Sequence, residues 1–561
     1  MAALKPMDET LAGYLADESR THGAAQAIAF PVSEAEVVEV VCQVRQDASG
    51  PITIQGARTG LAAGAVPYGG TVLNTSRMNR VTGLVSHGDG SFSVQVQPGV
   101  VLQDLRRDLE RKSFDTTGWS QDSLDALEAF KAAPAQFFPT DPTETSACLG
   151  GMAACNASGA RSFRYGPVRP HISGLRLVTA AGDVIDLVRG QVRAQDGILA
   201  LATQSGASLE IPVPSYEMPQ AKCASGYFAS PAMDAVDLII GSDGTLGVIT
   251  QLTCDLLPVP ALTWGVNCFF SAEDAALSFV ELLQEAASAP AYVPAAEKPV
   301  ASEAGTSVLQ DAIVALEYFD GDALDILRAQ RAQDPAFSSL PELRCQERVC
   351  VYCELAASDH GLMIEAVAKI SEAMESVGAQ PDLSWVGTMA ADRERQRFFR
   401  HAVPESVNLL IDSYRAKDPA VTKVGSDMSV PRGKLRQVME LYRSTIQASG
   451  LQSAAWGHIG DNHLHVNLLP RNEAQWHQAK DLLALWAKEI SAMGGAVSAE
   501  HGVGKIKRDF LMPMYGPEGV RAMARTKLAL DPEGLFGQGT LFSLELLQEE
   551  AARQGVSGKG C

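Results

Sequence analysis

The sequence predicts an α+β protein of two or three domains. Its 561 residues are too many for one hydrophobic core. Before residue 258, loops rich in glycine and other small residues recur after strand-like segments. From Pro258 onward, strand-like and helical segments alternate, which is typical of an antiparallel sheet covered by helices. We therefore expect a domain boundary between residues 257 and 258.

Composition and charge exclude several classes of protein. The chain is 46% hydrophobic and 20% charged, as in globular proteins, and no apolar run approaches the roughly 18 residues of a membrane span. The first 20 residues carry acids and lack the apolar core of a signal peptide, so we expect a cytoplasmic protein. A net charge of −20 argues against a nucleic-acid partner, because phosphate contacts need clustered Lys and Arg. A small anionic substrate stays compatible, since the field inside a cleft can oppose the net charge.

The N-terminal region contains the first small-residue loop. We expect residues 1–30 to be helical and peripheral. Ser33 and Glu36 have the spacing of a capping box, so a helix should follow them. A short buried strand at 51–54 runs into the loop 55–67, whose backbone N–H groups can approach a pyrophosphate closely. An ordinary turn is the alternative, because the loop has neither a GxGxxG nor a Walker pattern.

Two more loops of this kind follow. One spans 139–159, and the other lies between strand-like runs in 237–260. Residues 113–136 form an insertion with a helical piece. Because three such loops occur in one region, we expect a single extended ligand bound along their backbone.

An arginine-rich segment lies in the second region. Arg393, Arg395, Arg397 and Arg400 fall within eight residues, and Lys423 follows. A charge run of this kind is either the solvated face of a helix or a site for an anion, and the sequence leaves both interpretations open.

The ten cysteines are scattered, and the tightest group is Cys345, Cys350 and Cys353. Its spacing matches part of a plant-type iron–sulfur motif, but no fourth ligand follows. Cys350 and Cys353 also lie in a strand-like run. Buried, reduced thiols are therefore the favoured interpretation.

The densest polar motif is GHIGDNHLHVNLLP at 457–470, followed by SAEHGVGK at 498–505. These two segments contain four of the chain's 10 histidines. His463 and His465 share one face if the segment is a strand. Two imidazoles and a carboxylate form a plausible set of metal ligands, and a further histidine could do acid–base work. A hydrogen-bonded core histidine is the alternative for any one of them.

In this order, the three loops and both histidine motifs resemble the FAD-dependent oxidoreductases of the vanillyl-alcohol-oxidase type. The resemblance covers roughly residues 30–542. Within that family the chain is similar to the D-lactate dehydrogenases, the D-2-hydroxyglutarate dehydrogenases and the glycolate oxidase flavin subunit. The resemblance implies an α+β fold: a two-subdomain FAD-binding domain (PCMH type) at 1–257 and an antiparallel-sheet cap at 258–499. It further implies a segment at 500–545 that returns to the FAD-binding domain, with a loose tail at 546–561.

The resemblance implies FAD, bound non-covalently because the first loop has no histidine for the covalent link known in the family. The residues expected to bind it are Gly56, Ala57, Arg58, Thr59, Gly60, Pro139, Thr140, Gly150, Gly151, Asn156, Ser158, Gly159, Tyr165, Gly166, Asp243, Gly244, Gly247 and Ile249.

The resemblance also assigns roles at the histidine motifs. A divalent metal is expected on His458, His465 and Glu500, with zinc preferred and manganese, iron or cobalt as alternatives. His501 is the expected base. The residues expected to bind substrate are Asn467, Lys423 and Arg400, with Arg395 or Arg397 as alternatives to Arg400.

Three positions depart from the family pattern. His463 follows Asn462 where Gly-Asn is usual, so its role stays open between a ligand, an outer contact and a structural residue. Asp243 stands where Glu is usual. Residues 537–540 read Gly-Gln-Gly-Thr where Asn-Pro-Gly-Lys is common.

The expected activity is oxidation of a D-2-hydroxy acid, resembling D-lactate or D-2-hydroxyglutarate, to the 2-oxo acid. The hydride would pass to flavin N5 and the electrons to a quinone, a cytochrome or an electron-transfer flavoprotein. A flavin-binding subunit of a larger redox complex, without activity of its own, is the first alternative, and a structural metal-binding module is the second. A homodimer and a peripheral position at the inner face of a membrane are both compatible with the sequence.

Overall fold

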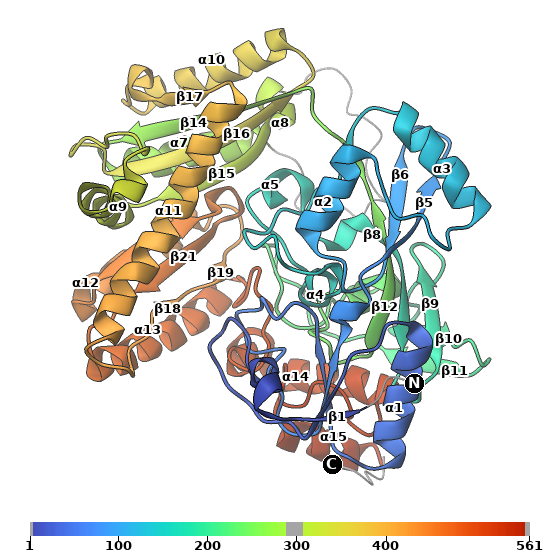
Figure 1. The fold of residues 1–561 in the computed structure, drawn as a ribbon. Helices are drawn as coiled ribbons and strands as arrows, with labels where there is room; N and C mark the ends of the chain where they lie inside the picture. Colours follow the sequence, from blue (N-terminus) through green and yellow to red (C-terminus); the bar gives the residue numbers. More distant parts are fainter. Residues whose placement is uncertain (1–3, 288–306, 556–561) are drawn as a thin grey trace.

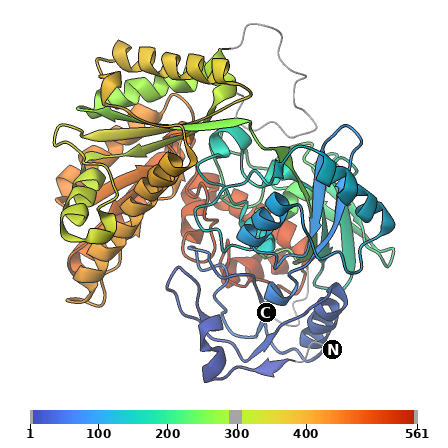
Figure 2. The same ribbon diagram turned by 45° about the horizontal axis from the view of Figure 1, so that its top comes forward.

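The computed structural model describes residues 4–287 and 307–555. Figures 1 and 2 show two bodies side by side, an N-terminal domain and a second domain, with the C-terminal helices packed against the first. Among the described residues, no helix has both the length and the hydropathy that a membrane crossing requires.

The N-terminal domain contains two main sheets. The smaller has the order β1-β2-β4-β3, and β4 pairs parallel with both of its neighbours. The larger is antiparallel with the order β5-β6-β12-β8-β9. Their strands are β1 (Lys5–Pro6), β2 (Ala27–Ala29), β3 (Ile52–Gln55), β4 (Thr71–Asn74), β5 (Val81–Ser86), β6 (Phe92–Val96), β8 (Ile172–Val178), β9 (Val184–Val188) and β12 (Val248–Asp255). Two small hairpin-like pairs are β10 (Ile198–Ala202) with β11 (Ser208–Pro212) and β7 (Gln136–Phe137) with β13 (Leu257–Pro258).

The sequence prediction of a helical N-terminus is wrong. Residues 4–30 form the short strands β1 and β2 and one 3-10 helix, Glu9–Leu15. The reason is tertiary, since β2 gains its hydrogen bonds from β4, which lies far along the chain. The next helix is as predicted. It is α1 (Glu34–Gln46), and Ser33 accepts a hydrogen bond from the backbone N–H of Glu36.

Five more helices belong to this domain: α2 (Leu102–Arg111), α3 (Gln121–Ala132), α4 (Leu149–Cys155), α5 (Ser162–Tyr165) and α6 (Ala235–Ile239). The insertion 113–136 supplies α3, which packs on β5. Phe130 is fully buried, with its ring centroid 5.3 Å from that of Phe92, and Trp119 donates to the carbonyl of Val81. The insertion is therefore part of the core.

The second domain is built on one antiparallel sheet with the order β17-β14-β16-β15-β20-β21-β18, to which β19 adds by pairing with β21. Its strands are β14 (Leu262–Phe270), β15 (Ile313–Phe319), β16 (Val349–Ala357), β17 (Trp385–Gly387), β18 (Val424–Gly425), β19 (Met428–Ser429), β20 (Ser453–Gly457) and β21 (His463–Leu468). Its helices are α7 (Glu273–Ala286), α8 (Val308–Ala312), α9 (Gly321–Gln333), α10 (His360–Ser376), α11 (Ala390–Arg415), α12 (Leu435–Ser449) and α13 (Glu473–Ala492). The strand–helix alternation thus predicts the correct class of domain.

Hydrophobic packing occurs on both faces of this sheet. On one face, α9 and α11 bury Leu324 and Phe399 against Phe319. Cys350 belongs to that cluster, whereas Cys353 belongs to the cluster on the opposite face. Because the two thiols point to opposite sides of β16, they cannot share an iron–sulfur cluster, and both are buried and free.

The segment after residue 500 lies on the N-terminal domain. The Ile52 N–H donates to the carbonyl of Leu535, and the Gly537 N–H donates to that of Ile52, so this segment continues the β3 edge. Its helices are α14 (Leu511–Leu530) and α15 (Leu544–Arg553). The prediction of a loose tail from 546 is wrong up to residue 553. There, α15 begins with Ser543 as its cap and buries Leu547 against the domain. Residues 556–561 lie outside the described chain.

A buried ion pair anchors this returning segment. Lys527 and Asp531 form it, and Lys527 Nζ also donates to the carbonyls of Thr245 and Phe536. We expect Lys527→Met to lower the free energy of unfolding by about 3–5 kcal/mol, because the Asp531 carboxylate would stay buried without its cation. Arg45→Met is the matched control. It removes an exposed pair with Glu533 of the same segment, which should cost less than about 1 kcal/mol. Equal losses in urea denaturation of the two variants would contradict this account.

Candidate active site

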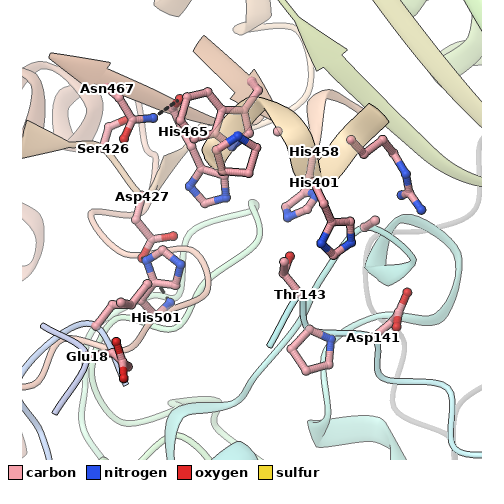
Figure 3. A pocket seen from close by; sticks show the side chains of 18 of the residues that line it. Glu18, Asp141, Thr143, His401, Ser426, Asp427, His458, His465, Asn467 and His501 are labelled. Carbon is pink, nitrogen blue, oxygen red and sulfur yellow. Dashed lines mark hydrogen bonds and ion pairs between the residues drawn. The ribbon is translucent and has the colours of Figure 1, made fainter. Parts of the chain in front are cut away.

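Two adjoining cavities lie at the junction of the domains. One, of about 1260 Å³, lies between the N-terminal domain and the second domain. The other, of about 300 Å³, is lined mainly by the N-terminal domain. His465 and His501 line both cavities. In Figure 3 the larger one is bounded by His458 and His465 from the second domain and by Asp141 and Thr143 from the first.

The smaller cavity is walled by the three small-residue loops. Gly56 follows β3, Gly150 and Gly151 lie in α4, and Asp243 precedes β12. Gly56 has no room for a side chain, because a Cβ there would lie 2.2 Å from the sulfur of Cys148. Twelve residues of the predicted cofactor set line this cavity: Gly56, Ala57, Arg58, Thr59, Gly60, Gly150, Gly151, Ser158, Asp243, Gly244, Gly247 and Ile249. Their small side chains and convergent backbone fit an extended dinucleotide.

Six predicted cofactor residues do not line either cavity: Pro139, Thr140, Asn156, Gly159, Tyr165 and Gly166. They shape the loops instead. Asn156 ends α4 in the left-handed conformation, and its side chain accepts from the backbone N–H of Arg169 and donates to the carbonyl of Cys223. A Cβ on Gly159 would lie 1.8 Å from the carbonyl oxygen of Asp141, so two backbone segments cross there. Other residues of the 139–159 loop, which the sequence prediction omitted, lie in the wall, among them Pro142, Thr143 and Glu144.

Three histidines surround one carboxylate oxygen. His458 follows β20, and His463 and His465 lie on one face of β21, with ring centroids 4.6 Å apart. Glu500 Oε2 lies 3.2 Å from Nε2 of His458, 3.8 Å from Nδ1 of His463 and 3.5 Å from Nε2 of His465. These four ligand atoms all lie within 4.8 Å of one another. The set therefore brings together the three predicted ligands and also His463.

Outer contacts hold this set in place. Glu500 Oε1 accepts hydrogen bonds from Lys222 at 3.0 Å and Ser158 at 3.2 Å, which leaves Oε2 for the imidazoles. His458 Nδ1 hydrogen-bonds Glu317 Oε1 at 2.6 Å. Burial opposes protonation of His458, but Glu317 and then Glu500 outweigh it and raise its pKa to about 10. Such concentrated negative charge favours a cation among these groups.

The cluster fits a divalent metal by a further observation. His463 is fully buried. Its Nε2 lies 3.0 Å from Asp427 Oδ1, but its Nδ1 has no hydrogen-bond partner in the described parts of the chain. A buried polar atom without a partner costs about 1–3 kcal/mol, and a metal ion would remove that cost. Imidazole and carboxylate donors suit zinc, manganese, iron or cobalt.

Asp427 connects His501 to the cluster of histidines. Its Oδ2 lies 3.4 Å from Nδ1 of His501 and 2.5 Å from Nζ of Lys507, and it accepts a hydrogen bond from the hydroxyl of Ser498. The His501 ring stacks on that of His465, with centroids 5.4 Å apart and planes at 13°. Burial lowers the pKa of His501 to about 4, although Asp427 opposes the shift. His501 is thus a neutral imidazole positioned beside the histidine–glutamate cluster.

The arginine-rich segment is helix α11, and its residues separate by face. Arg393 and Arg395 face outward, Arg393 donating to the carbonyl of Thr388 and Arg395 lying over the Trp385 ring. Arg397 and Arg400 line the larger cavity. Arg400 lies over the Tyr352 ring, and its buried Nε has no hydrogen-bond partner among the residues described. Arg393 and Arg395 therefore lie on the outward face of the helix, and Arg397 and Arg400 lie where an anion in the cavity could reach them.

The other two predicted substrate contacts also line the larger cavity. Lys423 lies 6.0 Å from the centre of the Trp456 ring, and burial, with a smaller contribution from Arg20, lowers its pKa. Asn467 donates to the carbonyl of His465, as the dashed line in Figure 3 marks.

Sequence reasoning missed the residues that support the cluster: Lys222, Glu317, Asp427 and Lys507. Lys222, Glu317 and Asp427 are single charged residues outside both histidine motifs, and only the fold brings their segments together, so no local pattern could have identified them. Lys507 lies two residues after the motif at 498–505, and that proximity is the one signal the sequence offered.

Comparison with known families agrees with this arrangement. Residues 25–118 and 123–188 match the FAD binding domain, and residues 284–541 match the C-terminal domain of FAD linked oxidases. Together the two matches cover most of the chain, and both contribute residues to the wall of the larger cavity.

Curated relatives match over nearly the whole length. The chain is 24% identical over 540 residues to a D-lactate dehydrogenase of Anaerostipes hadrus, with 95% of this chain and 93% of that protein covered. It is 24% identical to the glycolate oxidase subunit GlcD of Bacillus subtilis (strain 168), with 90% and 86% covered. It is 26% identical to the mitochondrial D-2-hydroxyglutarate dehydrogenase of Bos taurus, with 92% and 76% covered.

A solved alkyldihydroxyacetonephosphate synthase has a similar fold. Its TM-score is 0.55 at 14% identity, and the match covers 92% of this chain and 76% of that one. The fold, the two domain matches and the curated relatives all agree. The chain therefore belongs to the FAD-linked oxidases and is an FAD-dependent oxidoreductase.

Proposed function

We propose that this protein oxidises a D-2-hydroxy acid to the 2-oxo acid with the help of a divalent metal. The observation that carries the proposal is the position of the cluster of His458, His465 and Glu500, with His501 beside it, where the two cavities meet. The smaller cavity is the site expected for part of the FAD, and the larger one has room for a substrate. The relatives named for D-lactate and D-2-hydroxyglutarate support the substrate class.

The reaction removes a proton from the substrate hydroxyl oxygen and a hydride from the carbon that carries this hydroxyl. Bound FAD supplies the acceptor for the hydride, and a divalent cation supplies a Lewis acid for the hydroxyl oxygen. His501 accepts the hydroxyl proton, because its imidazole is neutral and the Asp427 carboxylate beside Nδ1 stabilises the imidazolium that forms. Arg400 binds the substrate carboxylate, since it lines the cavity and its Nε has no hydrogen-bond partner among the described residues. His458, His465 and Glu500 hold the cation, and Asn467 lies beside them.

The electrons must leave the flavin for a second acceptor. A quinone, a cytochrome or an electron-transfer flavoprotein is the proposed class of partner.

Anaerobic mixing with a panel of hydroxy acids tests the proposal. We expect D-lactate or D-2-hydroxyglutarate to bleach the flavin band and L-lactate to leave it unchanged. Treatment with a chelator should abolish bleaching, and zinc or manganese should restore it. A protein that bleaches with no 2-hydroxy acid, while binding a partner subunit stably, would instead be a flavin-binding subunit of a larger complex. Full activity after complete metal removal would contradict the metal-assisted mechanism.

Arg400→Met should weaken use of the substrate. A charge-assisted hydrogen bond contributes about 1.5–3 kcal/mol, so we expect kcat/KM to fall by about 10- to 100-fold. Arg395→Met is the matched control on the same helix, because Arg395 lies over Trp385 away from the cavity. Steady-state kinetics with an artificial electron acceptor measures both. Similar losses in the two variants would indicate a general effect of charge instead of a direct contact.

A further inference from the structure

We propose that His463 is a fourth protein ligand of the divalent cation, beside His458, His465 and Glu500. The inference rests on the proposed metal site and extends it by one residue. It would make the site a set of three imidazoles and one carboxylate.

Distances within the cluster support four ligands. The three imidazole nitrogens that face Glu500 Oε2 lie 3.2, 3.5 and 3.8 Å from it, and the longest distance is that of His463 Nδ1. Donor atoms around a tetrahedral ion with bonds of 2.0–2.2 Å are about 3.3–3.6 Å apart. The separations between the carboxylate and the imidazoles are therefore close to those that one shared ion requires, and all four ligand atoms lie within 4.8 Å of one another.

The Nδ1 atom of His463 has no other evident partner. The side chain is 0% exposed, and within residues 4–287 and 307–555 Nδ1 makes no hydrogen bond. Buried polar atoms are normally hydrogen-bonded. Binding of an ion by Nδ1 would account for a residue that is otherwise costly to bury.

The opposite edge of the His463 ring faces a carboxylate. Its Nε2 lies 3.0 Å from Asp427 Oδ1, at hydrogen-bond distance but without hydrogen-bond alignment. His458 has the same arrangement, with Nδ1 bonded to Glu317 and Nε2 facing Glu500. Metal-bound histidines usually give their second N–H to a carboxylate, which fixes the ring and strengthens the ligand. The chain supplies such a carboxylate for both residues.

Four protein ligands change what the ion can do. A catalytic zinc with three protein ligands keeps its fourth position for water or substrate. With His463 as a ligand, four protein groups would hold the ion, so fewer positions would remain for the substrate hydroxyl. Asp427 would then contact both a metal ligand, His463, and the proposed base, His501, so that one carboxylate orients both.

Two measurements on the flavoprotein test this. Zinc K-edge X-ray absorption counts the imidazoles on the ion, and we expect three in the wild type and two in His463→Asn. Zinc content after equilibration with graded chelator gives the affinity. We expect His463→Asn to lose at least about 100-fold, which is the upper end of the range for outer contacts. His477→Asn, on the exposed face of α13, is the matched control and should leave affinity unchanged.

The outcomes separate this inference from the proposed function. Two imidazoles in the wild type, or unchanged affinity in His463→Asn, would overturn the fourth ligand alone, provided that His458→Asn and His465→Asn lose zinc. If those two variants also retain zinc, the metal site itself is wrong. The flavin spectrum checks that each variant is folded. If His463→Asn does not fold, the wild-type absorption spectrum still decides the ligand count.

Discussion

Replacing Glu500 by glutamine is expected to remove the metal and slow flavin reduction by at least about 100-fold. Glutamine keeps the shape of the side chain but removes the charge that faces three imidazoles. A neutral amide is a poor ligand for a divalent cation, so metal affinity should fall by at least the 10- to 100-fold seen for outer contacts. Elemental analysis of the purified variant and anaerobic stopped-flow reduction by substrate measure the two effects.

The same substitution should also destabilise the fold. Lys222 is buried, and its closest acidic oxygen is Glu500 Oε1 at 3.0 Å, with Asp461 at 3.6 Å. Loss of one partner leaves much of the ammonium charge uncompensated. The double variant Glu500→Gln/Lys222→Met should therefore recover thermal stability without recovering metal. Recovery of metal as well would show that Glu500 acts only as a partner of Lys222. Glu473→Gln, an exposed residue on α13, serves as the control for purification and metal loading.

Most of the fold could be predicted because its signals are local. The capping pattern at Ser33 and the strand–helix alternation of the second domain depend on neighbouring residues, and the structure agrees with both. The errors lie where pairing is distant. Strand β2 exists because β4 supplies its hydrogen bonds, and α15 is ordered because Leu547 packs on the returning segment. Neither contact can be predicted from the sequence of the short segment alone.

In the candidate site, too, the residues in local motifs could be predicted and the residues that support them could not. His458, His465, Glu500 and His501 occur in two dense motifs, so the sequence singles them out. Their supports come from elsewhere, with Glu317 on β15 and Asp427 between β18 and β19. The sequence also predicts that His463 and His465 share a face, and the structure agrees. Only the packed cluster shows that His463 faces Glu500.

Replacing His501 by asparagine should slow flavin reduction by at least about 100-fold, the usual contribution of a positioned base. Asparagine can still make hydrogen bonds at this position, but it cannot take up a proton. His501 lies beside Asp427 and His465 and lines the cavity, whereas Glu500 faces the imidazoles of the proposed metal site. Metal content and substrate affinity should therefore change much less than the rate.

Two companion variants make that result specific to proton transfer. His401→Asn changes another histidine that lines the same cavity from α11, and it should leave the rate close to that of the wild type. Asp427→Asn should give an intermediate loss, because it removes the carboxylate that holds His501 Nδ1 without removing the imidazole. A rate retained in His501→Asn would instead assign the proton to another group in the cavity wall.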